Sequence, residues 1–190
     1  MVAQCTQSTS NQSPVTVIIE FVALNRRQVL FLVRFFVLLL VCYVAVAVKP
    51  IDAHVITPFT KGITAVSASI LNLMGEKVTR TGTMITGGDF AVDIKNGCNG
   101  VEAMLFLCAA MFAFDAPMKA RIAGILMACV GVQLLNLVRI VSLFLLGRHR
   151  REWFEAFHLA IWQSIIFGAA VLMFVLWTTR VQRQNAAPAA

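Results

Sequence analysis

A cysteine in a short polar turn is the first residue whose surroundings suggest chemistry. Cys98 lies in the stretch "KNGCNG", residues 95 to 100, and the apolar segment "VEAMLFLCAAM" follows directly. A thiol becomes a strong nucleophile when a base accepts its proton and a cation or a helix amino terminus favours the thiolate. The turn therefore predicts a nucleophile, provided that the fold brings a base and a cation to it.

Two later residues could supply the cation and the base. Arg139 follows Gln133 and Asn136 at intervals of three residues, which places all three within about 120° of one helix face. A charge inside an apolar helix costs several kcal/mol unless it is paired, so Arg139 is a functional candidate. His158 lies in "EAFHLAIWQ", where polar sequence gives way to an apolar run. A histidine at a helix end is commonly structural, so its case depends on convergence with the other two.

The composition indicates which elements must position these side chains. The chain has 190 residues, of which 59% are hydrophobic and 13% charged. Soluble domains are nearer half apolar and a quarter charged, so we predict an integral membrane protein with a single domain. The net charge of +7 needs no nucleic-acid partner, because basic residues at the ends of membrane spans account for it.

Four apolar runs predict an all-α, multi-pass transmembrane bundle. The second run, at roughly 1.5 Å per residue, reaches only about 24 Å and suits a thin bilayer or polar ends at the interface. The predicted spans are Gln28 to Val48, about Gly100 to Asp115, Ile122 to Leu146 and about Leu159 to Thr178.

Alternating spans bring the three candidates to one side of the membrane. Cys98 precedes the second span, Arg139 lies late in the third and His158 begins the fourth. We therefore expect a thiol, a guanidinium and an imidazole in one pocket, whichever way the chain is inserted. There Arg139 can hold the thiolate or a developing oxyanion, and His158 can take and return the proton. His54 and His149 remain alternative bases, although neither begins a span.

The remaining cysteines have no such surroundings. Cys42, Cys108 and Cys129 lie within apolar runs and read as small core residues, and Cys5 lies in the polar amino terminus. Neither a disulfide pair nor a metal-ligand spacing is apparent, so no metal or other cofactor is expected.

Basic flanks predict the orientation. Arginines and lysines before the first span, between the second and third, and after the fourth would all lie on the cytoplasmic side. Both termini would then be cytoplasmic, and the site would face outward. Arg148, Arg150 and Arg151 contradict this rule. They are either ordinary surface arginines or contacts to an acidic group or to lipid phosphates.

The segments outside the spans have their own patterns. In the outer loop, residues 49 to 97, Thr57-Pro58 predicts a helix start, and apolar residues recur from Phe59 to Leu73. This amphipathic helix, residues 58 to 74, lies on the membrane surface or on other helices; a fifth span is less favoured. Gly87-Gly88 predicts a β-hairpin whose second strand leads to Cys98.

We predict one membrane-embedded catalytic domain over residues 15 to 180. Residues 1 to 14 and 181 to 190 are expected to be disordered. Residues 15 to 25 form either a surface helix or an extension of the first span.

The blocks "NGCNGVEA", "NLVRI" and "FHLAIWQ" resemble the three motifs of the exosortase/archaeosortase family. Its members are multi-pass membrane cysteine proteases or transpeptidases, and the resemblance covers roughly residues 84 to 175. It implies Cys98 as nucleophile, Arg139 as transition-state partner and His158 as acid/base. The commoner turn is Cys-Ser-Gly-Leu, and Asn99 departs from it. The chain is also short and resembles a compact member, of the exosortase H type.

The resemblance implies a substrate class and a location. Family substrates are exported proteins that end in a short motif, a transmembrane helix and a basic tail. Cleavage would occur at the periplasmic face of a bacterial inner membrane, followed by transfer to water, an acceptor amine or a lipid. Asn99, Gln133 and Asn136 are candidates for binding substrate or for holding the catalytic residues in position. Glu102, four residues after Cys98, would pair with Arg139 or with an arginine of residues 148 to 151.

Two other classes of protein remain open. The chain could be a non-catalytic subunit or scaffold of an export or polysaccharide-assembly system, with its polar residues joining helices. It could also be a small transporter in which Arg139 binds an anion, although no internal repeat or pair of broken helices supports this. A change of Cys98 to serine would be silent in a scaffold.

Overall fold

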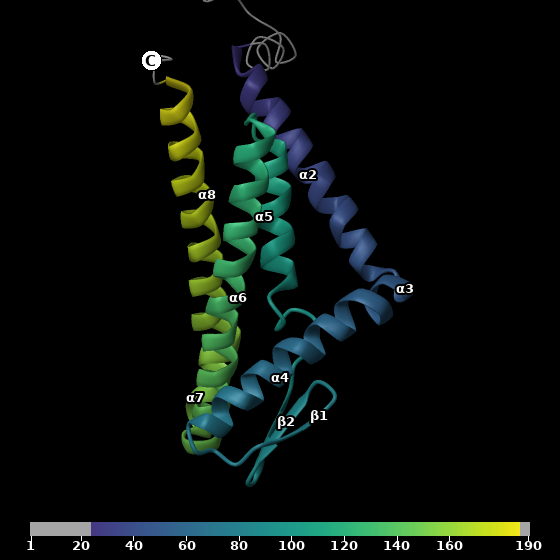
Figure 1. Cartoon of the computed structure of the whole chain (residues 1–190), viewed down its shortest axis with the longest axis vertical. Helices are drawn as coiled ribbons and strands as arrows, with labels where there is room; N and C mark the ends of the chain where they lie inside the picture. The colour runs from purple at the N-terminus through teal and green to yellow at the C-terminus, as the bar shows by residue number, and fades with distance from the viewer. Residues whose placement is uncertain (1–23, 187–190) are drawn as a thin grey trace, which may run out of the picture.

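The computed structural model describes residues 24 to 186, and most of this range is helical. Four long helices run lengthwise beside one another (Figure 1). They are α2 (Arg26–Ala47), α5 (Val101–Ala113), α6 (Met118–His149) and α8 (Trp162–Ala186). Short helical segments, α7 (Arg151–Ala156) and η2 (Phe157–Ile161), lead into α8 without a break.

Three of the described helical stretches are long and apolar enough to cross a membrane: Arg26–Ala47, Met118–His149 and Arg151–Gln184. The second predicted span is the exception, because α5 has 13 residues and is about 20 Å long. The predicted fold class, a transmembrane helical protein with a small sheet, is confirmed.

The helix α2 packs on the bundle along one narrow stripe. Phe35 is buried in one cluster with Ala109, Ala110 and Ala113 of α5, where small side chains allow the helices to approach closely, and Phe31 packs against this cluster. Most other apolar residues of α2 point outward, as expected for a helix whose remaining surface faces lipid.

The bundle end near the amino terminus of α6 is held by apolar and aromatic packing. Leu107, Met111, Val132 and Trp177 belong to one buried cluster there. The indole N–H of Trp177 donates to the carbonyl oxygen of Ala120, at 3.0 Å. We call this end the aromatic end.

The opposite end carries a helical arm and a sheet. The arm consists of α3 (Lys49–Ile51), the π-helical segment η1 (Asp52–Ile56) and α4 (Thr57–Leu73), and it crosses the bundle obliquely (Figure 1). The helix predicted over residues 58 to 74 is α4, which lies one residue earlier at each end, and its predicted start was wrong in one respect. Thr57 is itself helical and does not cap the helix, because the chain is helical from Lys49 onward. Pro58 lacks an N–H, and the wide turn η1 accommodates that gap in the hydrogen-bond ladder.

The arm turns a face of small and polar residues toward the protein. Thr60, Thr64 and Ser67 are buried on α4 together with Ala68 and Leu71. Part of the apolar stripe points outward instead, with Val66 and Leu73 exposed. The helix α4 is not among the described helices that are long and apolar enough to cross a membrane.

The sheet has three antiparallel strands, β1 (Thr79–Thr81), β2 (Met84–Gly87) and β3 (Phe90–Asp93), in that order. The predicted hairpin is β2 with β3, paired from Gly87 opposite Phe90 to Met84 opposite Asp93. Strand β1 was missed, because its residues "TRT" are all exposed and lack apolar alternation. The buried Ile85 of β2 packs with Phe144 of α6, which joins sheet and bundle.

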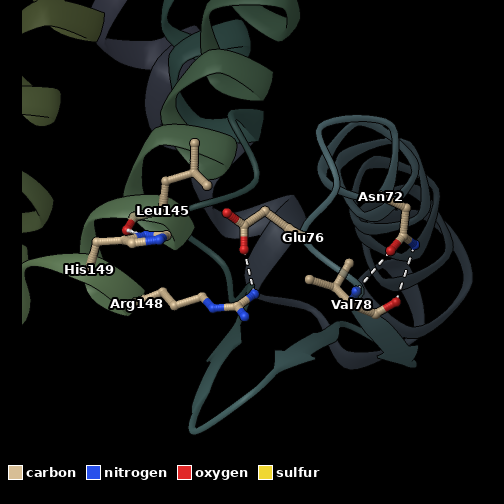
Figure 2. A network of polar contacts seen from close by, with 6 residues as sticks. All are labelled: Asn72, Glu76, Val78, Leu145, Arg148 and His149. Atoms are coloured by element: carbon tan, nitrogen blue, oxygen red, sulfur yellow. Dashed lines mark hydrogen bonds and ion pairs between the residues drawn. The ribbon is translucent and has the colours of Figure 1, made fainter.

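Polar contacts join the arm, the sheet and α6 (Figure 2). The amide of Asn72 donates to the carbonyl oxygen of Val78 and accepts from the N–H of Val78, at 3.1 and 2.8 Å. The carboxylate of Glu76 pairs with the guanidinium of Arg148. Arg151 in turn pairs with Asp89 at 3.1 Å. Arg150 lies 3.9 Å from Glu152, so all three arginines of the basic cluster contact acidic groups of the protein itself.

The chain ends differ from the prediction where they are described. Helix α8 continues to Ala186, so residues 181 to 186 of the expected disordered tail are helical. The predictions for residues 1 to 14, for 187 to 190 and for most of 15 to 25 lie outside the described residues.

Candidate active site

The three predicted site residues lie together. Cys98 lies in the turn before α5, Arg139 lies late in α6 and His158 lies in η2. The Sγ atom of Cys98 is 3.3 Å from Nε2 of His158 and 3.9 Å from Nη2 of Arg139. Arg139 and His158, which follow Cys98 by 41 and 60 residues in the chain, therefore both approach its sulfur atom.

Two glycines shape the turn that holds Cys98. Gly97 and Gly100 have φ of +87° and +78°, in the left-handed region that L side chains rarely adopt. Gly100 also has no room for a side chain, because a Cβ there would lie 2.8 Å from Nε2 of Gln133. The N–H of Cys98 donates to the carbonyl oxygen of Lys95, at 2.9 Å. The sequence "NGCNG" therefore forms a compact turn packed against α6.

Arg139 is buried and directed at this turn. Its side chain is 4% exposed, and its Nη1 donates to the carbonyl oxygen of Gly97 at 3.4 Å. Its Nε has no hydrogen-bond partner among the described residues. Its partners in the part of the chain that the structure describes are a carbonyl and a thiol, so this buried guanidinium retains a strong field at the sulfur atom.

The predicted ion pair of Glu102 was wrong. In the described part of the chain, Glu102 pairs neither with Arg139 nor with the later arginines, which contact Glu76, Asp89 and Glu152. The prediction assumed a helix running from Cys98 to Glu102. Helix α5 begins only at Val101, so the two residues are not on one helix face.

His158 is held by an aromatic neighbour. Its ring stacks on Phe154, with centroids 5.5 Å apart and planes 21° from parallel. The two alternative bases are engaged elsewhere: Nδ1 of His54 bonds to the carbonyl oxygen of Pro50, and Nδ1 of His149 to that of Leu145. His158 is therefore the histidine that the fold places at the thiol.

The four other candidate residues differ in how closely they contact the turn that holds Cys98. Asn99 is buried in the turn, where its Oδ1 accepts from the N–H of Val101 at 3.1 Å. Gln133 donates to the carbonyl oxygen of Asn99 at 3.2 Å. Asn136 is fully buried behind Gly100, and its amide has no partner among the described residues. Glu102, by contrast, contributes no described contact to the turn beyond its approach to Gly97.

Sequence reasoning missed one residue at the site. The Oγ1 of Thr60, on α4, accepts a hydrogen bond from Nδ2 of Asn99 at 2.9 Å. The available signal was the spacing of Thr60, Thr64 and Ser67 along one helix face. The prediction of α4 used only its apolar residues and did not consider that polar face.

The arrangement can support nucleophilic attack by sulfur. The S–N distance is within reach of proton transfer from the thiol to His158, and the resulting thiolate would lie beside the Arg139 guanidinium. The amino terminus of α5 adds a positive potential near the turn. Cys42, Cys108 and Cys129 are also free thiols, but they lie on α2, α5 and α6 within the bundle.

Comparison with known proteins places the chain in a family. The family model described as transmembrane exosortase, of the EpsH type, matches residues 6–177. Neither the curated proteins nor the solved structures gave a match. The chain therefore belongs to the transmembrane exosortase family. The match does not separate subfamilies, so the exosortase H assignment stays a prediction.

Proposed function

We propose that this transmembrane exosortase is a cysteine endopeptidase or transpeptidase with Cys98 as nucleophile, His158 as general acid and base, and Arg139 as electrostatic partner. Its substrates are exported proteins that carry a C-terminal sorting signal of motif, transmembrane helix and basic tail. The observation that carries this proposal is the approach of His158 and Arg139 to the Cys98 sulfur, at 3.3 and 3.9 Å.

The reaction follows from the positions of the three side chains. The thiol proton moves to Nε2 of His158, and Sγ of Cys98 attacks the scissile carbonyl carbon. The carbonyl oxygen becomes an oxyanion that the Arg139 guanidinium can stabilise. When the C–N bond breaks, His158 gives its proton to the leaving amine, and a thioester remains on Cys98.

The thioester is then resolved by a second nucleophile. Water, an acceptor amine or a lipid group attacks the thioester carbon, and His158 accepts the proton of the attacking group. The C–S bond breaks, and the released thiolate of Cys98 recovers that proton from His158. The same geometry supports hydrolysis and transfer, so the acceptor decides between them.

Charge distribution supports an inner-membrane location with a periplasmic site. The aromatic end carries Lys119 and Arg121 at the start of α6 and Arg180 and Arg183 towards the end of α8, as cytoplasmic ends of spans do. At the site end, Arg148 and Arg151 are paired with Glu76 and Asp89. These ion pairs give both arginines a structural role at the site end. The exposed apolar residues of α4 would then contact the outer leaflet.

The alternative is a non-catalytic membrane scaffold. In that case the polar residues of α6 would only join helices, and the contact between Cys98 and His158 would be incidental. Observations favour the enzyme, because Arg139 is directed at the turn and not at a neighbouring span. The transporter reading loses support for the same reason.

Co-expression with a candidate substrate tests the proposal. The substrate ends in motif, span and basic tail, and its size is followed by immunoblot beside wild type, Cys98→Ala and the matched control Cys129→Ala. The proposal predicts loss of the cleaved form with Cys98→Ala, Arg139→Ala and His158→Ala at equal protein levels, and normal cleavage with Cys129→Ala. Equal processing by wild type and Cys98→Ala would contradict the cysteine mechanism and favour the scaffold.

A further inference from the structure

The helical arm contacts the residues on both sides of Cys98. Thr60 and Asn99 are 3% and 1% exposed, and their side chains are joined by the 2.9 Å hydrogen bond. Nearer the start of the arm, Oδ1 of Asp52 accepts from Nδ2 of Asn96 at 3.0 Å. The turn is therefore bonded to a segment about 40 residues earlier in the chain, which takes no part in the proposed chemistry.

Asn99 is the centre of these contacts. Its Nδ2 donates to Oγ1 of Thr60 and, at 3.3 Å, to Oδ1 of Asn96. Its Oδ1 accepts from the N–H of Val101, and its backbone carbonyl accepts from Gln133. The residue after the nucleophile is thus tied to α4, to α5 and to α6 at once.

The turn depends on such contacts for its shape. Glycine at positions 97 and 100 permits the left-handed backbone but also leaves the chain free to adopt other conformations. The side-chain bonds of Asn99 select one of them. We propose that Thr60 is a positioning residue, which holds the Asn99 side chain and thereby keeps the Cys98 sulfur within reach of His158 and Arg139. This inference rests on the proposed function.

The next turn of α4 provides an internal control. Thr64 is also buried, but its hydroxyl donates to the carbonyl oxygen of Thr60 in its own helix, at 2.7 Å. The Thr60 hydroxyl likewise donates along the helix, to Ile56 at 2.8 Å, and in addition accepts from Asn99. The two threonines therefore share burial and the helix contact, and they differ in the contact with the turn.

The experiment measures kcat and KM of the full chain in proteoliposomes, with a membrane-inserted reporter that wild type cleaves. Thr60→Val keeps the side-chain volume and removes the acceptor for Asn99. We expect kcat to fall by about tenfold, because small displacements of reacting groups have effects of this order or larger, with KM within about twofold of wild type. Thr60→Ser should restore kcat to within about twofold, and Thr64→Val should match wild type.

Thr60→Ala is measured beside Thr60→Val, because the smaller residue removes the same acceptor without a branched side chain. Unchanged kcat in either variant would overturn the inference, as would an equal loss in Thr64→Val, which would indicate a purely structural role. Failure of the proposed function has a different signature: Cys98→Ala would then cleave the reporter as wild type does.

Discussion

The two ends of the bundle are stabilised in different ways. At the aromatic end, the buried cluster is apolar, Trp177 fills the space beside Gly124, and among the described residues there only Nε of Arg121 is a buried side-chain polar atom without a partner. At the site end, polar side chains from the arm, the turn and α6 converge, and the amide of Asn136 and Nε of Arg139 lack partners among the described residues. Buried polar groups without partners lower stability and commonly mark function. The aromatic end therefore maintains the fold, and on the proposed function the site end maintains a reactive geometry.

Replacement of Arg139 should separate catalytic activity from folding stability most strongly. Arg139→Met keeps much of the side-chain volume and removes a buried charge that has no carboxylate partner within residues 24 to 186. We expect activity to fall by about 10²- to 10³-fold, as when an oxyanion-stabilising donor is lost. The thermal midpoint of unfolding should stay equal or rise, since an apolar replacement of a buried charge is often neutral or stabilising. Cleavage rate and thermal midpoint in detergent check this, and a large drop in the midpoint would contradict it.

A change in the turn itself should lower both catalytic activity and folding stability. Gly100→Ala introduces a Cβ at φ +78° and 2.8 Å from Nε2 of Gln133. We expect a destabilisation of about 1–3 kcal/mol from strain and overpacking, together with a loss of activity of about 10²-fold. Denaturant titration and reporter cleavage measure the two effects. Gly62→Ala, in an open position on α4, is the control, and both of its values should be near wild type.

The aromatic end should show the reverse pattern. A Cβ at position 124 would lie 2.1 Å from Nε1 of Trp177, so Gly124→Ala must displace the indole ring. We expect the free energy of unfolding to fall by about 1–3 kcal/mol, while kcat per folded molecule stays within about twofold of wild type. An activity loss in folded protein larger than that of Gly100→Ala would show that the two ends are not independent.

The smallest effect is expected from a single hydrogen bond. Trp177→Phe removes the 3.0 Å bond to the carbonyl oxygen of Ala120 and keeps most of the aromatic packing. The free energy of unfolding should fall by about 1 kcal/mol with no change in cleavage rate. A parallel measurement on Leu172→Phe, at an exposed position of α8, gives the background expected for a substitution without a described polar contact.

Much of the site could be predicted because membrane spans constrain where residues can lie. Consecutive spans alternate in direction, so the approximate positions of Cys98, Arg139 and His158 along the chain sufficed to place them on one side. The bounds of α4 and the β2–β3 hairpin also followed from local patterns. These features depend on periodicity and turn chemistry, which are readable from short windows of sequence.

The features that were missed depend on contacts between distant segments. The bond from Thr60 to Asn99 joins residues 39 positions apart. The spacing of Thr60, Thr64 and Ser67 marks a polar face of α4, but it does not show which residue that face contacts. The pair expected for Glu102 failed because the helix begins three residues after Cys98, a detail set by glycine at positions 97 and 100. Strand β1 exists because β2 offers it an edge, although its own residues are polar and exposed.

The central claim is that Cys98 forms a covalent bond with the substrate. The most direct measurement is mass spectrometry of the full chain after brief incubation with the reporter and acid quenching, with and without hydroxylamine. If Cys98 is the nucleophile, the amino-terminal part of the reporter will be attached to the peptide containing Cys98, hydroxylamine will remove it, and Cys98→Ala will lack it. Cleavage of the reporter by Cys98→Ala, or an adduct on Cys42, Cys108 or Cys129 in place of Cys98, would contradict it.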